Sequence, residues 1–219
     1  MRIDNYKAFC SQLEEVIIEY PGLSIGQKGD LKYVKGVLDI YNDQAIVAGS
    51  YLVEICFTEH FPFQFPKLYE TGQAIPDEAD WHKYPDGSCC LTVRPDEIII
   101  CKAGITVSAF IKNFCIPFFA NHIYRKLEGK YKNGEYAHGP IGVAQYYNGL
   151  LRTSDKVKWQ QYFDHVFGQK IFKLKRNELC FCGSSIKYKS CHLMIFKSMW
   201  DIGSKRIRSD FKLIDPFFN

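Results

Sequence analysis

The chain lacks several features that would decide its class at once. No uninterrupted apolar run approaches the roughly 20 residues of a transmembrane helix, and the first residues carry no apolar core like that of a signal peptide. Internal repeats and low-complexity segments are missing, which excludes repeat and fibrous architectures. There is no glycine-rich nucleotide loop, so any ATP-dependent activation would have to come from another protein. These absences favour a globular protein of the cytoplasm, with no membrane partner.

The composition is that of a globular protein, with many aromatic side chains and nine cysteines. Of the 219 residues, 47% are hydrophobic, 24% charged and 16% aromatic, which suits one medium domain with a small appendage. An odd number of cysteines favours reduced thiols, metal ligands or a nucleophile over a set of disulfides. Cys10, Cys56 and Cys115 lie within apolar segments, so we expect them to be buried.

Positive charge is concentrated near the C terminus. From Gln169 onward there are eleven Lys and Arg residues and four Asp and Glu residues, whereas the rest of the chain has a net charge of −3. Such a basic tail could bind nucleic acid or an acidic protein surface. Because clustered charge is more often a solvated surface, nucleic acid is the less favoured partner and a zinc-dependent nucleic-acid binder is our third hypothesis.

The strongest local motif lies in this tail. Cys180-Phe-Cys182-Gly-Ser-Ser is followed about nine residues later by the pair Cys191-His192. Three thiols and one imidazole are the donors that a tetrahedral Zn²⁺ site requires. Four protein ligands leave no position for a reacting water, so we predict a structural zinc site. With Arg176-Asn177 ahead of it, the motif resembles the SEC-C zinc motif, which implies the same four ligands.

Hydrophobic periodicity predicts an α+β fold in the first half of the chain. Apolar residues at three- and four-residue spacing predict a helix capped by Asp4 and ended by Pro21-Gly22. Residues 31–41 and the alternating segment 51–57 predict strands, which the order of the elements makes antiparallel. The proline-containing segment 61–69 predicts an extended crossing whose aromatic side chains enter a core.

The second half is predicted to be helical between loops. Residues 72–105 lack periodicity, and so long an irregular segment is usually functional. Helical spacing returns over 106–127, although Pro117 must break or kink that helix. Residues 129–149, rich in Gly and Tyr, are predicted to form a loop, and 156–167 a helix.

We place the domain boundary after this last helix. Residues 1–168 form the larger predicted domain, and 169–219 form a tail that zinc must stabilise because fifty residues are few for a core. Trp200, Ile202 and Phe217-Phe218 are expected to pack on the tail or on the larger domain. An exposed partner-binding patch is the alternative for these side chains.

Residues 4–127 resemble the ubiquitin-conjugating enzymes (UBC). Segment 50–57 followed by 61–68 resembles their third strand and its Tyr-Pro-Phe-x-Pro-Pro continuation. Residues 82–91, His-Lys-Tyr-Pro-Asp-Gly-Ser-Cys-Cys-Leu, resemble the His-Pro-Asn … Gly-x-x-Cys-Leu active-site block, and 105–108 resemble the Leu-Thr-Ile-Ser start of the next helix. The resemblance implies a UBC-like fold: an N-terminal helix, an antiparallel meander sheet, a long active-site loop and C-terminal helices.

The active-site block is most similar to the bacterial branch of this family, whose members stand in antiphage (CBASS) operons beside a cyclic-nucleotide synthase. The resemblance implies a transferase that forms a cysteine thioester with the C terminus of a partner protein, the synthase first of all. It would transfer or hold that C terminus and so regulate antiviral signalling. The alternative is a catalytically inactive UBC-like module that recognises the synthase or another protein.

Three cysteines compete for the role of nucleophile. A thioester relay needs an accessible thiolate, and an exposed cysteine supplies some at neutral pH without a dedicated base. The Gly-x-x-Cys-Leu match favours Cys90. Cys101 is second because the neighbouring Lys102 would lower its pKa. Cys89 is third, since alternation along the chain turns one of the adjacent pair inward.

The residue that stabilises the oxyanion is left open. In the family this donor is an asparagine eight residues before the nucleophile, and here that position is His82. His82 either takes part directly, as its acid–base range allows, or stabilises the loop. Asp86 and Asp96 could orient an incoming amine, although acids in a polar loop are usually just solvated.

A cysteine peptidase is the rival interpretation of the same nucleophile. It would pair Cys90 with His122 or His138, since the two members of such a pair can be distant in sequence. No asparagine-supported signature accompanies either histidine. The peptidase interpretation is therefore the least favoured.

Overall fold

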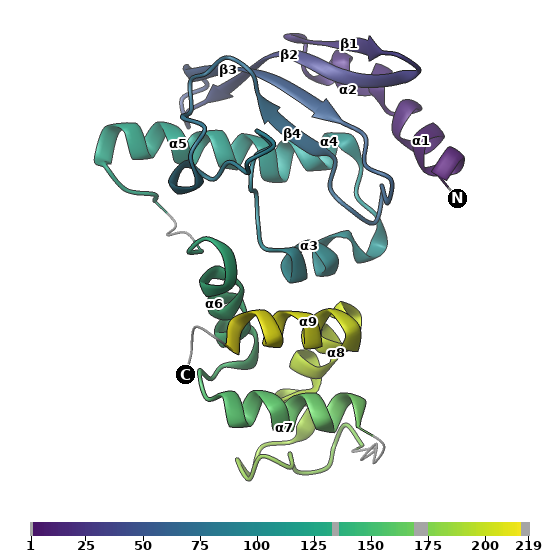
Figure 1. Ribbon diagram of the computed structural model, residues 1–219, viewed down its shortest axis with the longest axis vertical. Helices are drawn as coiled ribbons and strands as arrows, with labels where there is room; N and C mark the ends of the chain where they lie inside the picture. Colours follow the sequence, from purple (N-terminus) through teal and green to yellow (C-terminus); the bar gives the residue numbers. More distant parts are fainter. Residues whose placement is uncertain (1, 133–135, 169–174, 216–219) are drawn as a thin grey trace. The chain divides into compact units, whose positions relative to one another are not determined.

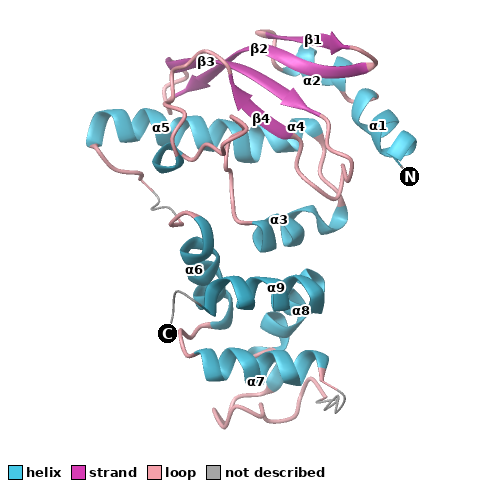
Figure 2. Cartoon of the chain, viewed as in Figure 1, coloured by secondary structure: helices cyan, strands magenta, loops and turns pink. Residues whose placement is uncertain are grey.

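The computed structural model describes residues 2–132, 136–168 and 175–215. It shows a four-stranded antiparallel sheet and a series of helices, which confirms the predicted mixed α and β composition (Figures 1 and 2). No helix in these ranges has the length and apolar character needed to cross a membrane.

The chain divides into two compact units, each with its own buried hydrophobic cluster. The first unit comprises Met1–Thr92 and Ile100–Glu135, and the second comprises Val93–Ile99 and Tyr136–Asn219. The division differs from the boundary expected at residue 168, because the helices between 139 and 167 are grouped with the C-terminal part.

The sheet of the first unit is a simple meander. Its strands are β1 (Leu23–Lys28), β2 (Leu31–Tyr41), β3 (Val47–Cys56) and β4 (Lys67–Glu70), paired in that order and antiparallel throughout. The strand predicted over 31–41 is confirmed to the residue. β1 and β4 are too short for their alternation to stand out in the sequence.

One face of the sheet is covered by helix α5 (Ile116–Glu128), as Figure 2 shows. Tyr51 of β3 stacks on Phe119 of α5 with ring centroids 4.2 Å apart. Because side chains alternate along a strand, the predicted inward set of β3 reaches this core together with every second residue of β2. These buried strand residues are Val34, Leu38, Ile40, Tyr51, Val53 and Ile55.

The single N-terminal helix predicted from Asp4 to Tyr20 is two helices, α1 (Arg2–Cys10) and α2 (Leu13–Glu19). The break lies at Gln12, whose side chain bonds outside its own helix. Its Nε2 donates to the carbonyl of Ala8 at 2.9 Å, and its Oε1 accepts the N–H of Val107 at 2.8 Å. A tertiary contact of this kind has no signal in local periodicity.

The proline-containing segment after β3 is also different from its prediction. Instead of an extended crossing, residues 59–64 form a series of turns that includes a cis peptide bond between Phe61 and Pro62. Phe61 and Phe65 enter the core as expected, whereas Phe63 is 59% exposed.

The long segment predicted to be irregular contains three short helices. They are η1 (Ala79–Trp81), α3 (Arg94–Ile100) and η2 (Cys101–Ala103). The stretch from His82 to Leu91 has neither helix nor strand, apart from isolated bridges. The predicted functional loop is thus shorter than the sequence indicated.

The helix predicted over 106–127 is present with an interruption. α4 (Val107–Phe110) leads into a π-helical turn, η3 (Ile111–Cys115), and then into α5. Pro117 stands in the first turn of α5, so its missing N–H falls where the hydrogen-bonding pattern changes. This π-helical turn is the form taken by the break that the sequence predicted.

The second unit is helical around its own core. Besides residues 94–99 of α3, its described residues contain four helices: α6 (Gly139–Leu151), α7 (Lys156–Phe167), α8 (Leu193–Ile202) and α9 (Ser204–Ile214), with the turn η4 (Tyr188–Ser190) before α8. α7 was predicted correctly. Side chains from all four helices form one buried cluster: Val143, Ala144, Tyr146, Tyr147, Leu151, Trp159, Tyr162, Phe163, Val166, Ile195, Phe196, Met199, Ile202, Ile207 and Ile214.

Helix α6 lies where the sequence predicted a loop. Pro140 occupies its first turn, where a missing N–H is tolerated. A Cβ at Gly142 would stand 1.8 Å from the carbonyl oxygen of Ala137, so this glycine permits a close backbone approach. At Gly142, therefore, glycine reflects close packing within a helix and not an irregular chain.

The apolar side chains expected near the C terminus have different environments. Ile202 is buried, whereas Trp200 is 63% exposed and stacks on Phe167 at 5.7 Å. Phe217-Phe218 lies outside the described residues. Trp200 thus packs on the second unit with one face only.

Candidate metal centre and candidate thiol site

The predicted zinc ligands lie together. One ligand atom from each of Cys180, Cys182, Cys191 and His192 falls within 4.8 Å of the other three. The Sγ atoms of Cys182 and Cys191 are 3.6 Å apart, and Nδ1 of His192 lies 3.2 Å from the Sγ of Cys180 and 3.0 Å from that of Cys191.

A short hairpin brings the ligands together. Leu179 pairs with Lys187, and the N–H of Cys180 donates to the carbonyl of Ile186 at 2.8 Å. Gly183, with φ of +77°, makes the turn between the two thiols and the rest of the hairpin. The second ligand pair stands at the start of α8, where His192 is the N-cap residue.

The donor set and spacing fit zinc. Zn–S bonds of about 2.3 Å in a tetrahedron place neighbouring sulfurs roughly 3.8 Å apart, close to the separation of Cys182 and Cys191. Soft thiolates with one imidazole select Zn²⁺ over the hard cations that prefer oxygen ligands. With Cys180, Cys182, Cys191 and His192 as ligands, such an ion would have no position left for a reacting water and would act as a structural crosslink.

A residue that the sequence did not single out completes the imidazole's contacts. Nε2 of His192 lies 3.0 Å from the hydroxyl of Tyr162, on α7, thirty residues earlier. If Nδ1 binds a metal ion, Nε2 would carry the hydrogen and donate it to this oxygen, which would fix the orientation of the ring. Phe181 and Phe196 pack around the same imidazole, at 5.6 and 5.5 Å.

The candidate thiol site is a tight loop against the edge of the sheet. The N–H of Cys89 donates to the carbonyl of Leu68 in β4 at 2.7 Å, and the N–H of Cys90 donates to the carbonyl of His82 at 2.7 Å. Tyr69 and Ser88 form an isolated bridge beside them. The backbone of this loop is therefore held on both sides of the two cysteines.

Asp86 shapes the turn before the thiols. Its Oδ1 accepts from the N–H of Ser88 at 3.0 Å and from the Ser88 hydroxyl, while Oδ2 pairs with the ammonium of Lys67. The hydrogen bond from Lys67, followed by those from Ser88, lowers the pKa of Asp86 to about 2. Gly87 follows with φ of +78°, as the tight turn requires.

The three competing cysteines differ in exposure. Cys89 is 7% exposed, and its burial raises the pKa of its thiol to about 12. Cys101 has no exposed surface and belongs to the core of the first unit. Cys90 is half-buried, the least buried of the three. The inward partner of the adjacent pair is Cys89, as alternation predicted.

His82 contributes to the loop through its backbone. It adopts the left-handed conformation with φ of +54°, and its carbonyl holds the N–H of Cys90. Its ring packs edge-on against Tyr131 at 5.2 Å. A left-handed residue other than glycine is uncommon and marks a constrained loop position.

Next to this position lies an aromatic and cationic cluster, which we define as Trp81, His122, Arg125 and Tyr131. The guanidinium of Arg125 lies 4.0 Å from the Trp81 ring centroid and donates to the Tyr131 hydroxyl at 2.8 Å. That hydroxyl lies 3.4 Å from Nδ1 of His122. Sequence spacing gave no sign of the cluster, because its members come from η1, α5 and the segment after it.

His122, one of the two histidines of the peptidase interpretation, is fully buried in this cluster. Burial, with smaller contributions from nearby cations, lowers its pKa to about 3, so the imidazole is neutral. His138 is the N-cap residue of α6 in the second unit, and Asp96 lies on α3 of that unit. Neither belongs to the unit that holds Cys90.

A buried ion pair between Lys83 and Glu70 lies beside the cysteine loop. Sequence analysis did not predict it. The ammonium of Lys83 donates to Asp77 at 2.8 Å and to Glu70 at 3.4 Å, with the Lys83 and Glu70 side chains only 2% and 0% exposed. The Glu70 carboxylate also accepts three backbone N–H groups, those of Gly72, Ala74 and Ile75. Lys83 pairs with Cys89 across an isolated bridge, so this network positions the cysteine loop.

Comparison with known proteins identifies one short region. The SEC-C motif family matches residues 176–193, the segment that contains all four candidate ligands. A comparison with curated proteins finds no match. The chain therefore contains a SEC-C motif whose Cys and His residues form a cluster compatible with zinc.

Proposed function

We propose that the first unit is a ubiquitin-conjugating-like transferase in which Cys90 forms a thioester with the C terminus of another protein. The observation that carries the proposal is burial: of Cys89, Cys90 and Cys101, only Cys90 is not buried. The meander sheet, the loop beside β4 and the helix that follows are the elements that the resemblance implies.

The chemistry needs only an accessible thiolate and an activated carboxyl. The thiolate of Cys90 attacks the carbonyl carbon of a C terminus that a separate activating enzyme presents as a thioester, and that enzyme's thiolate leaves. An amine then takes the acyl group and Cys90 departs as thiolate. The cyclic-nucleotide synthase of an antiphage operon is the partner that the resemblance favours, and holding or transferring its C terminus would regulate antiviral signalling.

The test is a covalent adduct in cells that express the chain with its neighbouring genes. We expect a slower-migrating species that dithiothreitol cleaves and that Cys90→Ala abolishes. Cys89→Ala is the matched control, since it removes the adjacent buried thiol and should leave the adduct in place. An adduct that survives in Cys90→Ala but disappears in Cys101→Ala would contradict the assignment.

The second candidate function is a UBC-like module that binds its partner without catalysis. It is favoured by position 82, where a histidine held in the left-handed conformation replaces the family's asparagine. The two functions differ in the reactivity of Cys90. Under limiting iodoacetamide, a nucleophile should be alkylated faster than the half-buried Cys10 and Cys56, whereas the binding module predicts equal rates for all three.

A further inference from the structure

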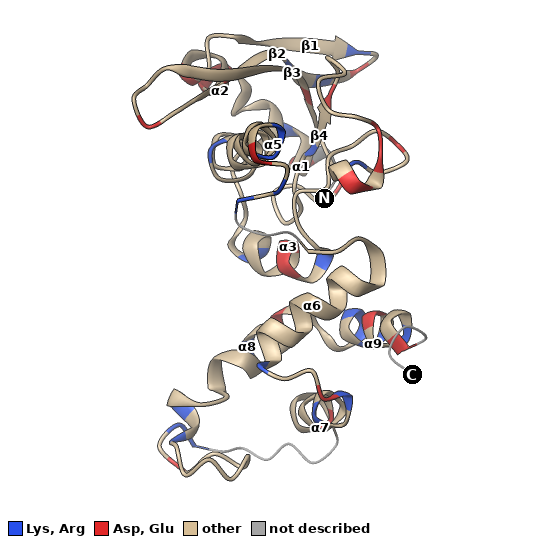
Figure 3. Cartoon of the chain, turned by 90° about the vertical axis from the view of Figure 1, so that its left-hand side faces the viewer, with Lys and Arg blue, Asp and Glu red and all other residues tan. Residues whose placement is uncertain are grey.

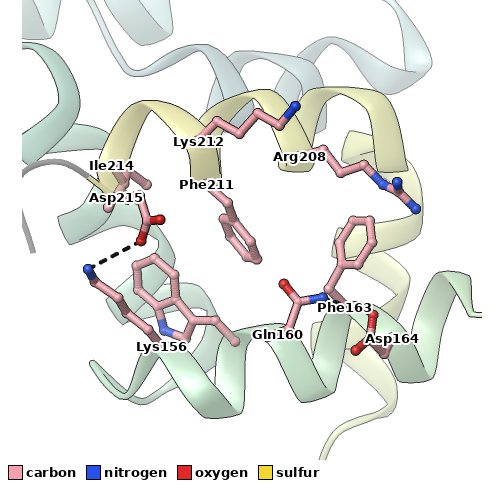
Figure 4. A pocket seen from close by; sticks show the side chains of 10 residues that line it. Lys156, Gln160, Phe163, Asp164, Arg208, Phe211, Lys212, Ile214 and Asp215 are labelled. Carbon is pink, nitrogen blue, oxygen red and sulfur yellow. Dashed lines mark hydrogen bonds and ion pairs between the residues drawn. The ribbon is translucent and has the colours of Figure 1, made fainter. Parts of the chain in front are cut away.

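Helices α7 and α9 of the second unit flank a pocket of about 460 Å³, shown in Figure 4. Small-molecule sites in proteins typically measure roughly 300–1,000 Å³ and combine an apolar lining with a few polar groups. The lining residues are Lys156, Trp159, Gln160, Phe163, Asp164, Arg208, Phe211, Lys212, Ile214 and Asp215. The pocket lies within one unit and is separate from Cys90 and from the metal ligands.

The floor of the pocket is aromatic. The ring centroid of Phe211 lies 5.3 Å from that of Trp159 and 6.2 Å from that of Phe163. The indole Nε1 of Trp159 donates to the carbonyl of Thr153 at 2.8 Å, which holds this ring in place. Such rings favour a flat ligand, because stacking on aromatic side chains stabilises a planar heterocycle by about 1–3 kcal/mol.

The rim on α9 is positively charged. Arg208 and Lys212 stand one turn apart, are exposed, and form no ion pair with any residue in the described part of the chain. Figure 3 shows basic residues along α9. The remaining cation of the lining, Lys156, is 3.5 Å from Asp215, so these two charges largely offset one another. An anionic group is therefore favoured beside Arg208 and Lys212.

The rim on α7 presents acceptors. Gln160 Nε2 donates to Asp164 Oδ1 at 2.9 Å, which leaves the second oxygen of Asp164 and the amide oxygen of Gln160 to accept hydrogen bonds. Figure 4 shows these two side chains on α7, across the pocket from Lys212 and Arg208 of α9. A ligand should thus carry N–H donors at one edge and negative charge at the other.

The position of α9 is fixed by a buried contact on its far side. Asp210, 1% exposed, accepts from the Tyr147 hydroxyl of α6 at 2.9 Å and from Nε of Arg206 at 3.0 Å. Because this contact does not involve the pocket's charged rim, the pocket is formed before any ligand enters.

We propose that this pocket binds a purine nucleoside phosphate. The base stacks on Phe211 over the aromatic floor, its N–H groups donate to Asp164 and Gln160, and the phosphate pairs with Arg208 and Lys212. The proposal concerns the second unit alone and does not depend on the function proposed for Cys90.

The test is calorimetric titration of the full zinc-loaded chain with guanosine 5′-monophosphate. We expect saturable binding, with guanosine and inorganic phosphate each binding at least tenfold more weakly, because each makes only half of the contacts. Arg208→Glu combined with Lys212→Glu should weaken the nucleotide at least tenfold, since both phosphate partners are replaced by like charges.

The matched control is Lys197→Glu combined with Lys205→Glu, which makes the same change in net charge at exposed positions outside the pocket. This control should bind within about twofold of the unmodified chain. No saturable binding at millimolar nucleotide, equal binding of inorganic phosphate, or an equal loss in the control pair would each overturn the proposal. Circular dichroism of both pairs establishes that they are folded.

Discussion

At the scale of single residues, Lys83 and Lys67 near the cysteine loop allow a buried ion pair to be compared with an exposed one. Lys83 and its partner Glu70 are almost fully buried, whereas Lys67 and Asp86 are 47% and 48% exposed. Removing one member of a buried pair leaves an uncompensated charge, while an exposed pair contributes little because solvent screens it.

We therefore expect Lys83→Met to lower the free energy of unfolding by about 3 kcal/mol, the lower end of the range for such pairs, since Glu70 keeps its backbone donors. Lys67→Met, the matched control, should cost less than about 1 kcal/mol. Urea denaturation of the three proteins measures both values. Equal losses in the two variants would show that the Glu70 pair is not the support of the loop.

His122 gives the first unit a predictable response to acid. Its pKa is near 3 in the folded chain and about 6.5 when unfolded, so the unfolded state binds more protons between these values. Stability contributed by the neutral imidazole is present above pH 6.5 and is lost as the pH falls towards 3. The loss between pH 7 and pH 5 is about 2 kcal/mol.

His122→Phe keeps a ring of similar size among Trp81, Phe118 and Tyr131 and removes the titrating group. We expect the free energy of unfolding to fall between pH 7 and pH 5 by about 2 kcal/mol less in this variant than in the unmodified chain. Urea denaturation at the two pH values, with zinc present, measures this difference. Both proteins contain the same metal ligands, so any effect of acid on the metal centre cancels when the two losses of unfolding free energy are subtracted. Identical losses would mean that the imidazole is protonated in the folded state.

At the scale of elements, the metal hairpin is tied to α7 through Tyr162. The hydroxyl that faces Nε2 of His192 orients the imidazole from outside the ligand set. Removing such a partner typically weakens metal binding about 10- to 100-fold.

Tyr162→Phe should therefore retain one zinc per chain but lose it to a chelator at a concentration about 10- to 100-fold lower. Competition with a chromogenic zinc indicator measures this difference. Tyr146→Phe is the control, because Tyr146 is also a buried tyrosine of the second unit and is outside the ligand cluster. Unchanged zinc affinity in Tyr162→Phe would show that this hydrogen bond does not hold the imidazole.

The elements also show where sequence reasoning succeeds. Strand β2 was predicted because it is rich in Val, Ile, Leu and Tyr, and helix α7 because its apolar residues stand at helical spacing over its full length. Helix α6 was missed because it contains three glycines, of which Gly142 makes a close backbone contact, and composition alone cannot distinguish such a helix from a loop. The break at Gln12 depends on a hydrogen bond to Val107, ninety-five residues away.

The candidate sites divide in the same way. The four metal ligands were predicted because they lie within thirteen residues of one another, so their spacing in the sequence already shows the motif. Cys90 was favoured by its motif. The supports of both sites, Tyr162 for the metal and the Lys83 network for the cysteine loop, come from distant segments and were visible only in the folded chain.

At the scale of the whole molecule, the two units carry different candidate chemistry. The first holds the cysteine loop on a sheet edge, and the second holds the SEC-C motif and an aromatic pocket on a helical core. Assigning α6 and α7 to the second unit explains how so short a motif is stabilised, since α7 supplies both core and metal-site contacts. The C-terminal part therefore has a hydrophobic core of its own beside the candidate metal cluster, whereas the boundary expected at residue 168 left zinc as its support.

The central claim, that Cys90 accepts the carboxyl end of another protein, is tested most directly by trapping the adduct at residue 90. Cys90→Ser should convert the thioester into an oxygen ester that resists dithiothreitol but is cleaved by hydroxide. Peptide mass spectrometry of this variant, purified from cells carrying its neighbouring genes, should place the C terminus of one partner protein on Ser at position 90. A trapped ester at any other residue would contradict the account. So would the absence of an adduct on Cys90→Ser together with an adduct on Cys90→Ala as abundant as on the unmodified chain.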